Sequence, residues 1–305
     1  MSSGSERERL EDEVRALKAA RNAIILAHNY QIGEVQDIAD FVGDSLELSV
    51  KAAAVRESVI VFCGVHFMAE TAAILSPDKT VLLPDGRAGC PMANMITAED
   101  VVAWRVKFPG RPVVSYVNTS AAVKAESDIC CTSSNAVRVV ESLPDPEILF
   151  APDRNLAAYV ARFTPKRIIP WDGYCHVHHG ILPRHIRDAK ALHPRAEVWA
   201  HPECRPEVID LADKVLSTGK MVTEARALGP GEAIVATESG ILYRLEKENP
   251  SGRFFAAHAV AICPNMKKTN LRNVHTALDQ MVHRVVVPPA TAERARGAIE
   301  RMIRN

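Results

Sequence analysis

The sequence lacks a surplus of charge of either sign. Its 37 lysines and arginines are balanced by 37 aspartates and glutamates. Proteins that bind nucleic acid or an anionic membrane surface usually carry a basic excess, so we expect neither partner. No apolar run reaches the roughly 20 residues of a membrane-spanning helix. Residues 1–21 are charged and helical in pattern rather than apolar, which predicts a cytoplasmic protein without a secretory signal.

Paired cysteine motifs are also missing. The seven cysteines form no CxxC pair, although residues 175–179 hold one cysteine and three histidines. Structural zinc sites are usually built from two paired clusters, so this spacing argues against zinc. An odd number of cysteines without a signal predicts thiols that are free or bound to metal in a reducing compartment. Burial as a small apolar side chain is the alternative for each of them.

Short β-rich runs alternate with helical patterns along the chain, and no Gly/Ser-rich or Pro-rich linker divides it. We predict strands at residues 23–30, 112–118 and 196–203, and helices after them at residues 34–42, 120–127 and 205–212. Strands that alternate with helices of this length form parallel βαβ units with helices on both faces of the sheet. Each of the three strands ends in polar residues. Because no linker marks the domain boundaries, they need another signal.

An internal repeat supplies that signal. Seventeen residues after each of three strand-end anchors, His28, Tyr116 and His201, stands a hydroxyl side chain: Ser45, Ser133 and Thr218. One cysteine follows the same anchors at 62, 59 and 62 residues: Cys90, Cys175 and Cys263. We therefore predict three copies of one αβα unit, with domains at residues 1–110, 111–196 and 197–305.

Three copies of one unit bring their strand ends together around a pseudo-threefold axis, where α/β folds bind ligands. The three repeat cysteines can then point at one spot. Three thiolates without a fourth protein ligand suit an iron–sulfur cluster with one open iron better than zinc. An open iron is a Lewis acid that helps to expel water from a substrate. The remaining cysteines do not recur at a common distance from the three anchors. They are predicted to be buried thiols: Cys63, Cys130, Cys131 and Cys204.

Motifs along the whole chain point to one family. They are AHNYQ (27–31), GDSLELS (43–49), FCGVHFMAETA (62–72), AGCPMA (88–93), YVNTSA (116–121), CTSSNA (131–136), APDRNLA (151–157), GYCHVH (173–178), HPEC (201–204), ATESGI (236–241) and CPNMKKT (263–269). In this order they resemble the quinolinate synthases. The resemblance implies an α/β fold of three pseudo-repeated three-layer αβα domains in a triangle around a central active site. We expect each domain to hold a four-stranded parallel sheet.

The resemblance also implies a reaction and a cofactor. A [4Fe–4S] cluster would be held by Cys90, Cys175 and Cys263. The enzyme would condense iminoaspartate with dihydroxyacetone phosphate, in bacterial NAD biosynthesis, to give quinolinate, phosphate and two waters. An aspartate-oxidising enzyme would supply the iminoaspartate.

Site residues follow from the same resemblance. The family's iminoaspartate contacts fall on His28, Ser45, Tyr116, Val117, Asn118, Ser133, His201, Pro202, Glu203 and Thr218. Tyr30, His201 and Glu203 are the candidates for proton transfer. The alternatives are helix N-caps for the two serines and a charged helix start for Glu203. Lys267 and Lys268 could meet the phosphate, but a solvated lysine pair is the expectation. His176 and His179 have no assigned role.

Two other classes of function stay open. An aconitase-like hydro-lyase with the same open iron would release water from a simple hydroxy acid and would need no phosphorylated substrate. A redox sensor with a labile cluster is the non-enzyme alternative. Polar strand ends in all three units argue against the sensor, since a sensor needs few of them.

Overall fold

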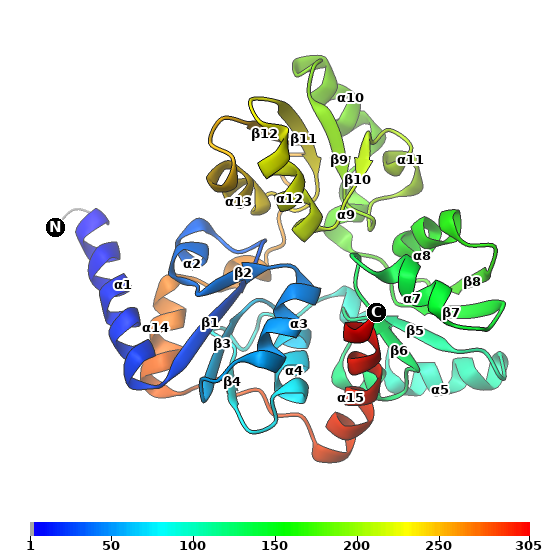
Figure 1. Ribbon diagram of the computed structural model, residues 1–305, viewed down its shortest axis with the longest axis horizontal. Helices are drawn as coiled ribbons and strands as arrows, with labels where there is room; N and C mark the ends of the chain where they lie inside the picture. Colours follow the sequence, from blue (N-terminus) through cyan, green and yellow to red (C-terminus); the bar gives the residue numbers. More distant parts are fainter. Residues whose placement is uncertain (1–2) are drawn as a thin grey trace.

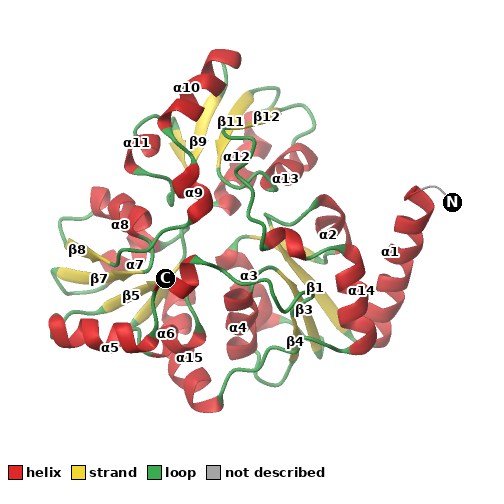
Figure 2. Ribbon diagram, turned by 180° about the vertical axis from the view of Figure 1, so that it is seen from behind, coloured by secondary structure: helices red, strands yellow, loops and turns green. Residues whose placement is uncertain are grey.

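The computed structural model, which describes residues 3–305, contains three similar units arranged as a triangle (Figure 1). Each unit has one four-stranded sheet in which every strand is parallel to its neighbours. All three sheets have the same order, with the unit's first strand between its second and third. Helices surround each sheet (Figure 2). The predicted fold class is therefore confirmed.

The strands have the following bounds. Unit 1 contains β1 (Ala23–His28), β2 (Phe41–Gly43), β3 (Val59–Cys63) and β4 (Thr80–Leu82). Unit 2 contains β5 (Val113–Tyr116), β6 (Ile129–Cys131), β7 (Glu147–Ala151) and β8 (Arg167–Pro170). Unit 3 contains β9 (Glu197–Ala200), β10 (Lys214–Val215), β11 (Glu232–Ala236) and β12 (Arg253–Ala256).

The helices have these bounds. The first part of the chain forms α1 (Ser3–Ala20), α2 (Gly33–Ile38), α3 (Ser45–Ala54), α4 (His66–Leu75), η1 (Met92–Met95) and α5 (Ala98–Lys107). The middle part forms α6 (Ala121–Ala125), α7 (Ala136–Ser142), α8 (Arg154–Val160), η2 (Ala161–Phe163), α9 (His176–Gly180) and α10 (Pro183–Leu192). The last part forms α11 (Pro206–Ile209), α12 (Thr218–Leu228), α13 (Ile241–Glu248), η3 (Met266–Lys268), α14 (Leu271–Gln280) and α15 (Pro289–Arg304).

β1 shows why these apolar runs become central strands. All six of its residues are buried. Ile24 and Leu26 belong to one hydrophobic cluster, whereas Ala23, Ile25 and Ala27 belong to another on the opposite face. Successive side chains of a strand point to opposite faces, so a strand covered on both faces has to be apolar throughout. The polar residues that follow it then lie at the edge where ligands can reach them.

The predicted strands are confirmed, but each ends two or three residues early: β1 at His28, β5 at Tyr116 and β9 at Ala200. Their last polar residues therefore lie in loops. The helix predicted over residues 34–42 is wrong at its end. It stops at Ile38, because Phe41–Gly43 pair with β1 as a parallel edge strand.

The last two helices cross back from unit 3 to the other units (Figure 1). α14 packs against α1 and β3, and α15 packs against α6 and β6 of unit 2 and α4 of unit 1. Ala295, Ala298, Ile299 and Met302 form the buried face of α15. The domain boundaries stay predictions, since the range 197–305 includes helices that contact all three units. Within residues 3–305, no helix has both the length and the apolarity needed to cross a membrane.

Candidate functional site

A cavity lies where the three units meet. His28 at the end of β1, Tyr116 at the end of β5 and His201 just after β9 all line it. The other predicted site residues that line the cavity are Tyr30, Ser45, Cys90, Asn118, Ser133, Cys175, Glu203, Thr218 and Cys263. The repeat therefore brings together residues that are up to about 235 positions apart, from His28 to Cys263.

Val117 and Pro202 are the predicted site residues that do not line the cavity. Both are buried. The Val117 N–H already donates to the carbonyl of Cys131 at 2.9 Å. Proline has no N–H. A ligand could therefore form hydrogen bonds with these two residues only through their main-chain carbonyls.

The three hydroxyl residues of the repeat stand at helix starts but do not cap the helices. Ser45 and Thr218 are the first residues of α3 and α12, and the capping side chains are those of Asp44 and Ser217 directly before them. Ser133 lies two residues ahead of the N-cap of α7. The N-cap alternative for the serines is therefore wrong. All three residues line the cavity, and the Thr218 hydroxyl accepts a hydrogen bond from the side-chain amide of Asn29 at 3.1 Å.

The two anchor histidines share a local geometry. Nδ1 of His28 accepts a hydrogen bond from the Tyr30 N–H at 3.1 Å, which leaves the ring proton on Nε2. Nδ1 of His201 lies 3.3 Å from the Glu203 N–H and 3.2 Å from its carboxylate Oε2. This ring can therefore accept from the amide or donate to the carboxylate. Burial lowers the pKa of His28 to about 3 and also lowers the pKa of His201, so both rings are neutral near pH 7.

A chain of buried polar contacts joins the units beside these histidines. The Tyr30 hydroxyl lies 2.5 Å from Thr237 Oγ1 and 3.3 Å from His178 Nε2. His178 Nε2 lies 2.8 Å from the same threonine hydroxyl. Burial raises the pKa of Tyr30 well above its ordinary value, so its phenol stays protonated unless a base accepts the proton. The imidazole of His178 is in position to be that base.

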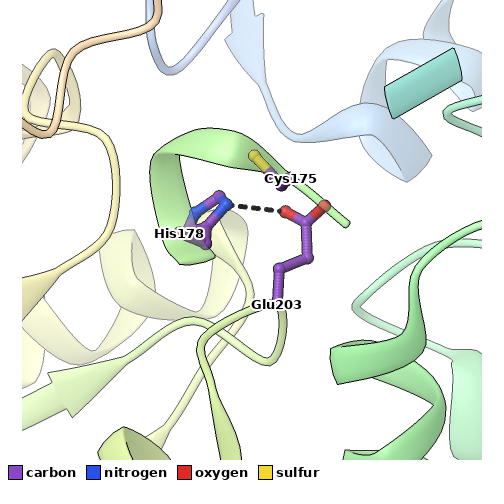
Figure 3. Close-up of side chains that lie close together, drawn as sticks. All are labelled: Cys175, His178 and Glu203. Carbon is purple, nitrogen blue, oxygen red and sulfur yellow. Dashed lines mark ion pairs between the residues drawn. The ribbon is translucent and has the colours of Figure 1, made fainter. Parts of the chain in front are cut away.

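Figure 3 shows the other side of this imidazole. His178 Nδ1 lies 3.1 Å from Glu203 Oε2, and the ligand atoms of Cys175, His178 and Glu203 lie within 4.8 Å of one another. Burial alone would raise the pKa of the Glu203 carboxyl, but its contacts with His178 and His201 together lower it. Within residues 3–305, the buried Glu203 Oε1 has no hydrogen-bond partner. The trio can hold a metal ion.

The cysteines fall into two groups. The three repeat cysteines line the cavity and are partly exposed, whereas the other four are buried, as predicted: Cys63, Cys130, Cys131 and Cys204. Burial raises the pKa of Cys90 to about 12 and also raises the pKa of Cys175 and Cys263. Without a cation in the cavity these thiols stay protonated. A metal that binds them therefore has to displace their protons.

The sequence matches the family described as "Quinolinate synthetase A protein" over residues 12–304. The chain belongs to this family. It is 55% identical to the quinolinate synthase of Dehalococcoides mccartyi strain 195 over 97% of this chain and 98% of that protein. It is 56% identical to that of Methanoregula boonei, over 96% and 97% of the two chains. Identity to the quinolinate synthase of Geobacter sp. strain M21 is 52%, over 97% of both chains. The relatives are enzymes, and so is this member of the family.

The predicted site residues did not include some polar residues in or beside the cavity: Asp44, His178, Thr237 and Glu238. Asp44, His178 and Glu238 line the cavity. Thr237 does not, but its hydroxyl contacts Tyr30 and His178, which do. Thr237 and Glu238 lie 36 and 37 residues after the anchor His201, so the repeat could have pointed to them. His178 was visible as one of three clustered histidines. Nothing in the local pattern separated it from its neighbours.

The prediction of a solvated lysine pair is wrong for Lys267. This side chain forms an ion pair with Glu238 at 2.9 Å rather than lying in solvent. His176 is exposed and lines the cavity. His179 lies outside the cavity lining, with its ring Nδ1 3.3 Å from the side-chain amide of Asn155.

Proposed function

We propose that the chain condenses iminoaspartate with dihydroxyacetone phosphate to give quinolinate, phosphate and two waters, a step of NAD biosynthesis. One observation carries this proposal: a single cavity is lined by one cysteine and one hydroxyl residue from each of the three units of a quinolinate synthetase A family member. The unstable imine substrate would come from an aspartate-oxidising enzyme, and we expect both to work in the cytoplasm.

The cavity fits the [4Fe–4S] cluster that we propose as cofactor. Cys90, Cys175 and Cys263 would hold it, and no fourth cysteine lines the cavity within residues 3–305. A cluster with three protein ligands keeps one iron open, which supplies Lewis-acid chemistry for the loss of water. The buried Glu203 Oε1, which has no hydrogen-bond partner among the described residues, also supports a bound group in this cavity. A buried acceptor needs a partner, and a ligand would supply one.

The remaining site residues suit a small dianionic substrate. We assign iminoaspartate contacts to His28, Ser45, Tyr116, Val117, Asn118, Ser133, His201, Pro202, Glu203 and Thr218. The Nε2–H of His28 and the hydroxyls are hydrogen-bond donors, and the starts of α3 and α12 add partial positive charge. The buried Asn118 Oδ1 has no partner among the described residues. Val117 and Pro202 can contribute their carbonyls.

We assign proton transfer to Tyr30, His201 and Glu203, with His178 as the connecting base. The carboxylate of Glu203 lies 3.1 Å from Nδ1 of His178, and it stabilises that ring when the ring is protonated. His178 Nε2 can then exchange a proton with Thr237 and Tyr30, which lie 2.8 and 3.3 Å away. Thus a proton can move between the cavity and the phenol without bulk water, because all of these side chains are buried.

A substrate-dependence assay tests the reaction. Anaerobic protein with its cluster should release phosphate and form quinolinate in equal amounts, and only when iminoaspartate and dihydroxyacetone phosphate are both present. Phosphate without quinolinate, or no product from the pair, would contradict the proposal. Release of water from a simple hydroxy acid, without need for a phosphorylated substrate, would favour the aconitase-like alternative.

A further inference from the structure

Each of the three cysteine loops is joined to its own unit by the same backbone hydrogen bond. The donor N–H belongs to the residue 38 positions after the anchor, and the acceptor carbonyl lies two residues before the cysteine. The pairs are His66 to Ala88 (2.7 Å), Arg154 to Gly173 (2.9 Å) and Ser239 to Ala261 (2.9 Å). Because this hydrogen bond is the same in all three units, the residues directly before its donors occupy equivalent positions.

That residue is Val65 in unit 1, Asp153 in unit 2 and Glu238 in unit 3. Asp153 Oδ2 accepts the backbone N–H of Cys175 at 3.1 Å. Glu238 Oε1 accepts the backbone N–H of Cys263 at 3.0 Å. Valine has no side-chain acceptor, so unit 1 has no counterpart of these bonds at this position. Two of the three cysteine loops therefore have a second attachment, through a carboxylate.

Both carboxylates are held independently of the cysteines. Asp153 is fully buried, and its Oδ1 accepts the N–H groups of Asn155 and Leu156, each at 2.8 Å. Glu238 is 1% exposed, and its Oε2 accepts the Gly240 N–H at 2.7 Å. Burying a carboxylate is unfavourable by several kcal/mol unless it is paired and hydrogen-bonded. These bonds fix the oxygen that faces each cysteine, while burial still raises the pKa of the Asp153 carboxyl group well above its ordinary value.

We propose that Asp153 and Glu238 are positioning residues for the cluster. By holding the amides of Cys175 and Cys263, they fix the direction of each Cα–Cβ bond and so aim the thiols at the centre of the cavity. Partners of metal ligands commonly set the orientation of those ligands. The inference rests on the proposed cluster, but the hydrogen bonds themselves belong to the chain alone.

A simpler explanation exists for Asp153, which is the N-cap of α8. The substitution Asp153→Asn separates the two roles. Asparagine is as good an N-cap as aspartate, and its Oδ1 still accepts both helix N–H groups. Its NH2 group then faces the Cys175 N–H, so two donors oppose each other. Glu238→Gln removes no helix cap, because the N-cap of α13 is Gly240, but it does remove the ion pair between Glu238 and Lys267 at 2.9 Å. Lys267→Gln, which removes that ion pair and keeps the Glu238 carboxyl group, is therefore its control and should change neither iron release nor exchange.

Iron release from the loaded full-length protein is the first test. After anaerobic reconstitution, iron and sulfide are measured, and iron is then withdrawn with an excess of a ferrous chelator. We expect Asp153→Asn and Glu238→Gln to release iron about tenfold faster than the unchanged protein, and the reduced cluster to give an altered electron paramagnetic resonance spectrum. Asp100→Asn, in the exposed capping box of α5, is the matched control and should change neither. Release rates within about twofold of the unchanged protein, with an unaltered spectrum, would overturn the proposal.

Amide exchange in the cluster-free protein is the second test. Asp153→Asn should speed hydrogen–deuterium exchange in residues 173–180 only, and Glu238→Gln in residues 261–268 only. Equal exchange in the variants and the unchanged protein would overturn the positioning role. If Asp153→Asn does not fold, Glu238→Gln decides the matter alone. An unchanged protein that takes up no iron and sulfide would refute the proposed cofactor, whereas the exchange data would still decide the positioning.

Discussion

At the scale of single residues, the site depends on which groups stay neutral and which stay charged. The buried histidines His28 and His201 are neutral donors or acceptors, whereas Glu203 between His178 and His201 is held as a carboxylate. Two neutral rings can bind an anionic substrate without adding buried charge. One carboxylate can then stabilise a proton that arrives on His178.

The first residue-scale prediction concerns Glu203. Glu203→Gln keeps the shape of the side chain but removes the charge that faces His178 at 3.1 Å. We expect a folded protein with normal iron content and substrate affinity, and a turnover number lowered by roughly a hundredfold, as for loss of a general acid or base. Glu207→Gln, on the exposed side of α11, is the control and should leave turnover unchanged. The helix-start alternative for Glu203 is wrong, because α11 begins at Pro206 and the acidic residue of its first turn is Glu207. Near-normal turnover of Glu203→Gln at matched iron content would show that Glu203 takes no part in proton transfer.

The second residue-scale prediction concerns pH. Burial lowers the pKa of His28 from its ordinary 6.5 to about 3. Between pH 6.5 and about pH 3 the unfolded chain binds a proton at His28 and the folded protein does not. The free energy of unfolding therefore falls as the pH falls through this window. In cluster-free protein, His28→Gln should reduce the slope of unfolding free energy against pH by about 1.4 kcal/mol per pH unit between pH 4 and 6. Urea unfolding at several pH values measures it.

Above about pH 8 both proteins should show the same slope, because His28 is then neutral in the folded and the unfolded state. Equal slopes between pH 4 and 6 would mean that His28 titrates normally in the folded protein. The ring would then be able to carry a charge in the cavity.

At the scale of secondary-structure elements, the starts of the helices join the three units. Asp44, the N-cap of α3 in unit 1, accepts the Ser134 hydroxyl of unit 2 at 2.6 Å. Its Oδ2 also lies 3.4 Å from the Ser217 hydroxyl of unit 3. One carboxylate therefore contacts all three units, beside the hydroxyls of Ser45 and Thr218.

Gly219 tests this junction. A Cβ added there would lie 2.8 Å from Asp44 Oδ2, and Asp44 cannot move away without losing its helix cap. We expect Gly219→Ala to lower the free energy of unfolding by about 1–3 kcal/mol through overpacking, despite the better helix propensity of alanine. Gly297→Ala in α15 is the matched control, since the nearest atom to its Cβ is 3.5 Å away. It should raise the free energy of unfolding by about 0.4–1 kcal/mol.

Both free energies come from urea unfolding of the cluster-free protein. A Gly219→Ala variant as stable as Gly297→Ala would show that unit 3 is not packed tightly against Asp44.

At the scale of the whole molecule, the sequence predicts the parts that the repeat carries. The anchors, hydroxyls and cysteines recur at nearly constant spacing, so knowing one unit predicts its copies, and their residues do line one cavity. Contacts between units have no such signal. The meeting of Tyr30, His178 and Thr237 depends on how the three units pack, because each of these residues comes from a different unit.

The C-terminal helices illustrate the same limit. The amphipathic pattern of α15 predicts that one face is buried, but not that it is buried between units 1 and 2. Nor does local pattern show that β2 takes Phe41 and Val42 from the end of a helical run, because only the pairing with β1 makes them a strand.

The central claim is that one cysteine from each unit holds the cluster, and iron and sulfide analysis of anaerobically purified variants tests it most directly. Cys90→Ala, Cys175→Ala and Cys263→Ala should each lose the cluster. The same change at the buried Cys63, Cys130 or Cys204 should leave iron and sulfide at the level of the unchanged protein. Equal loss of iron from both groups, with all variants folded, would contradict the account.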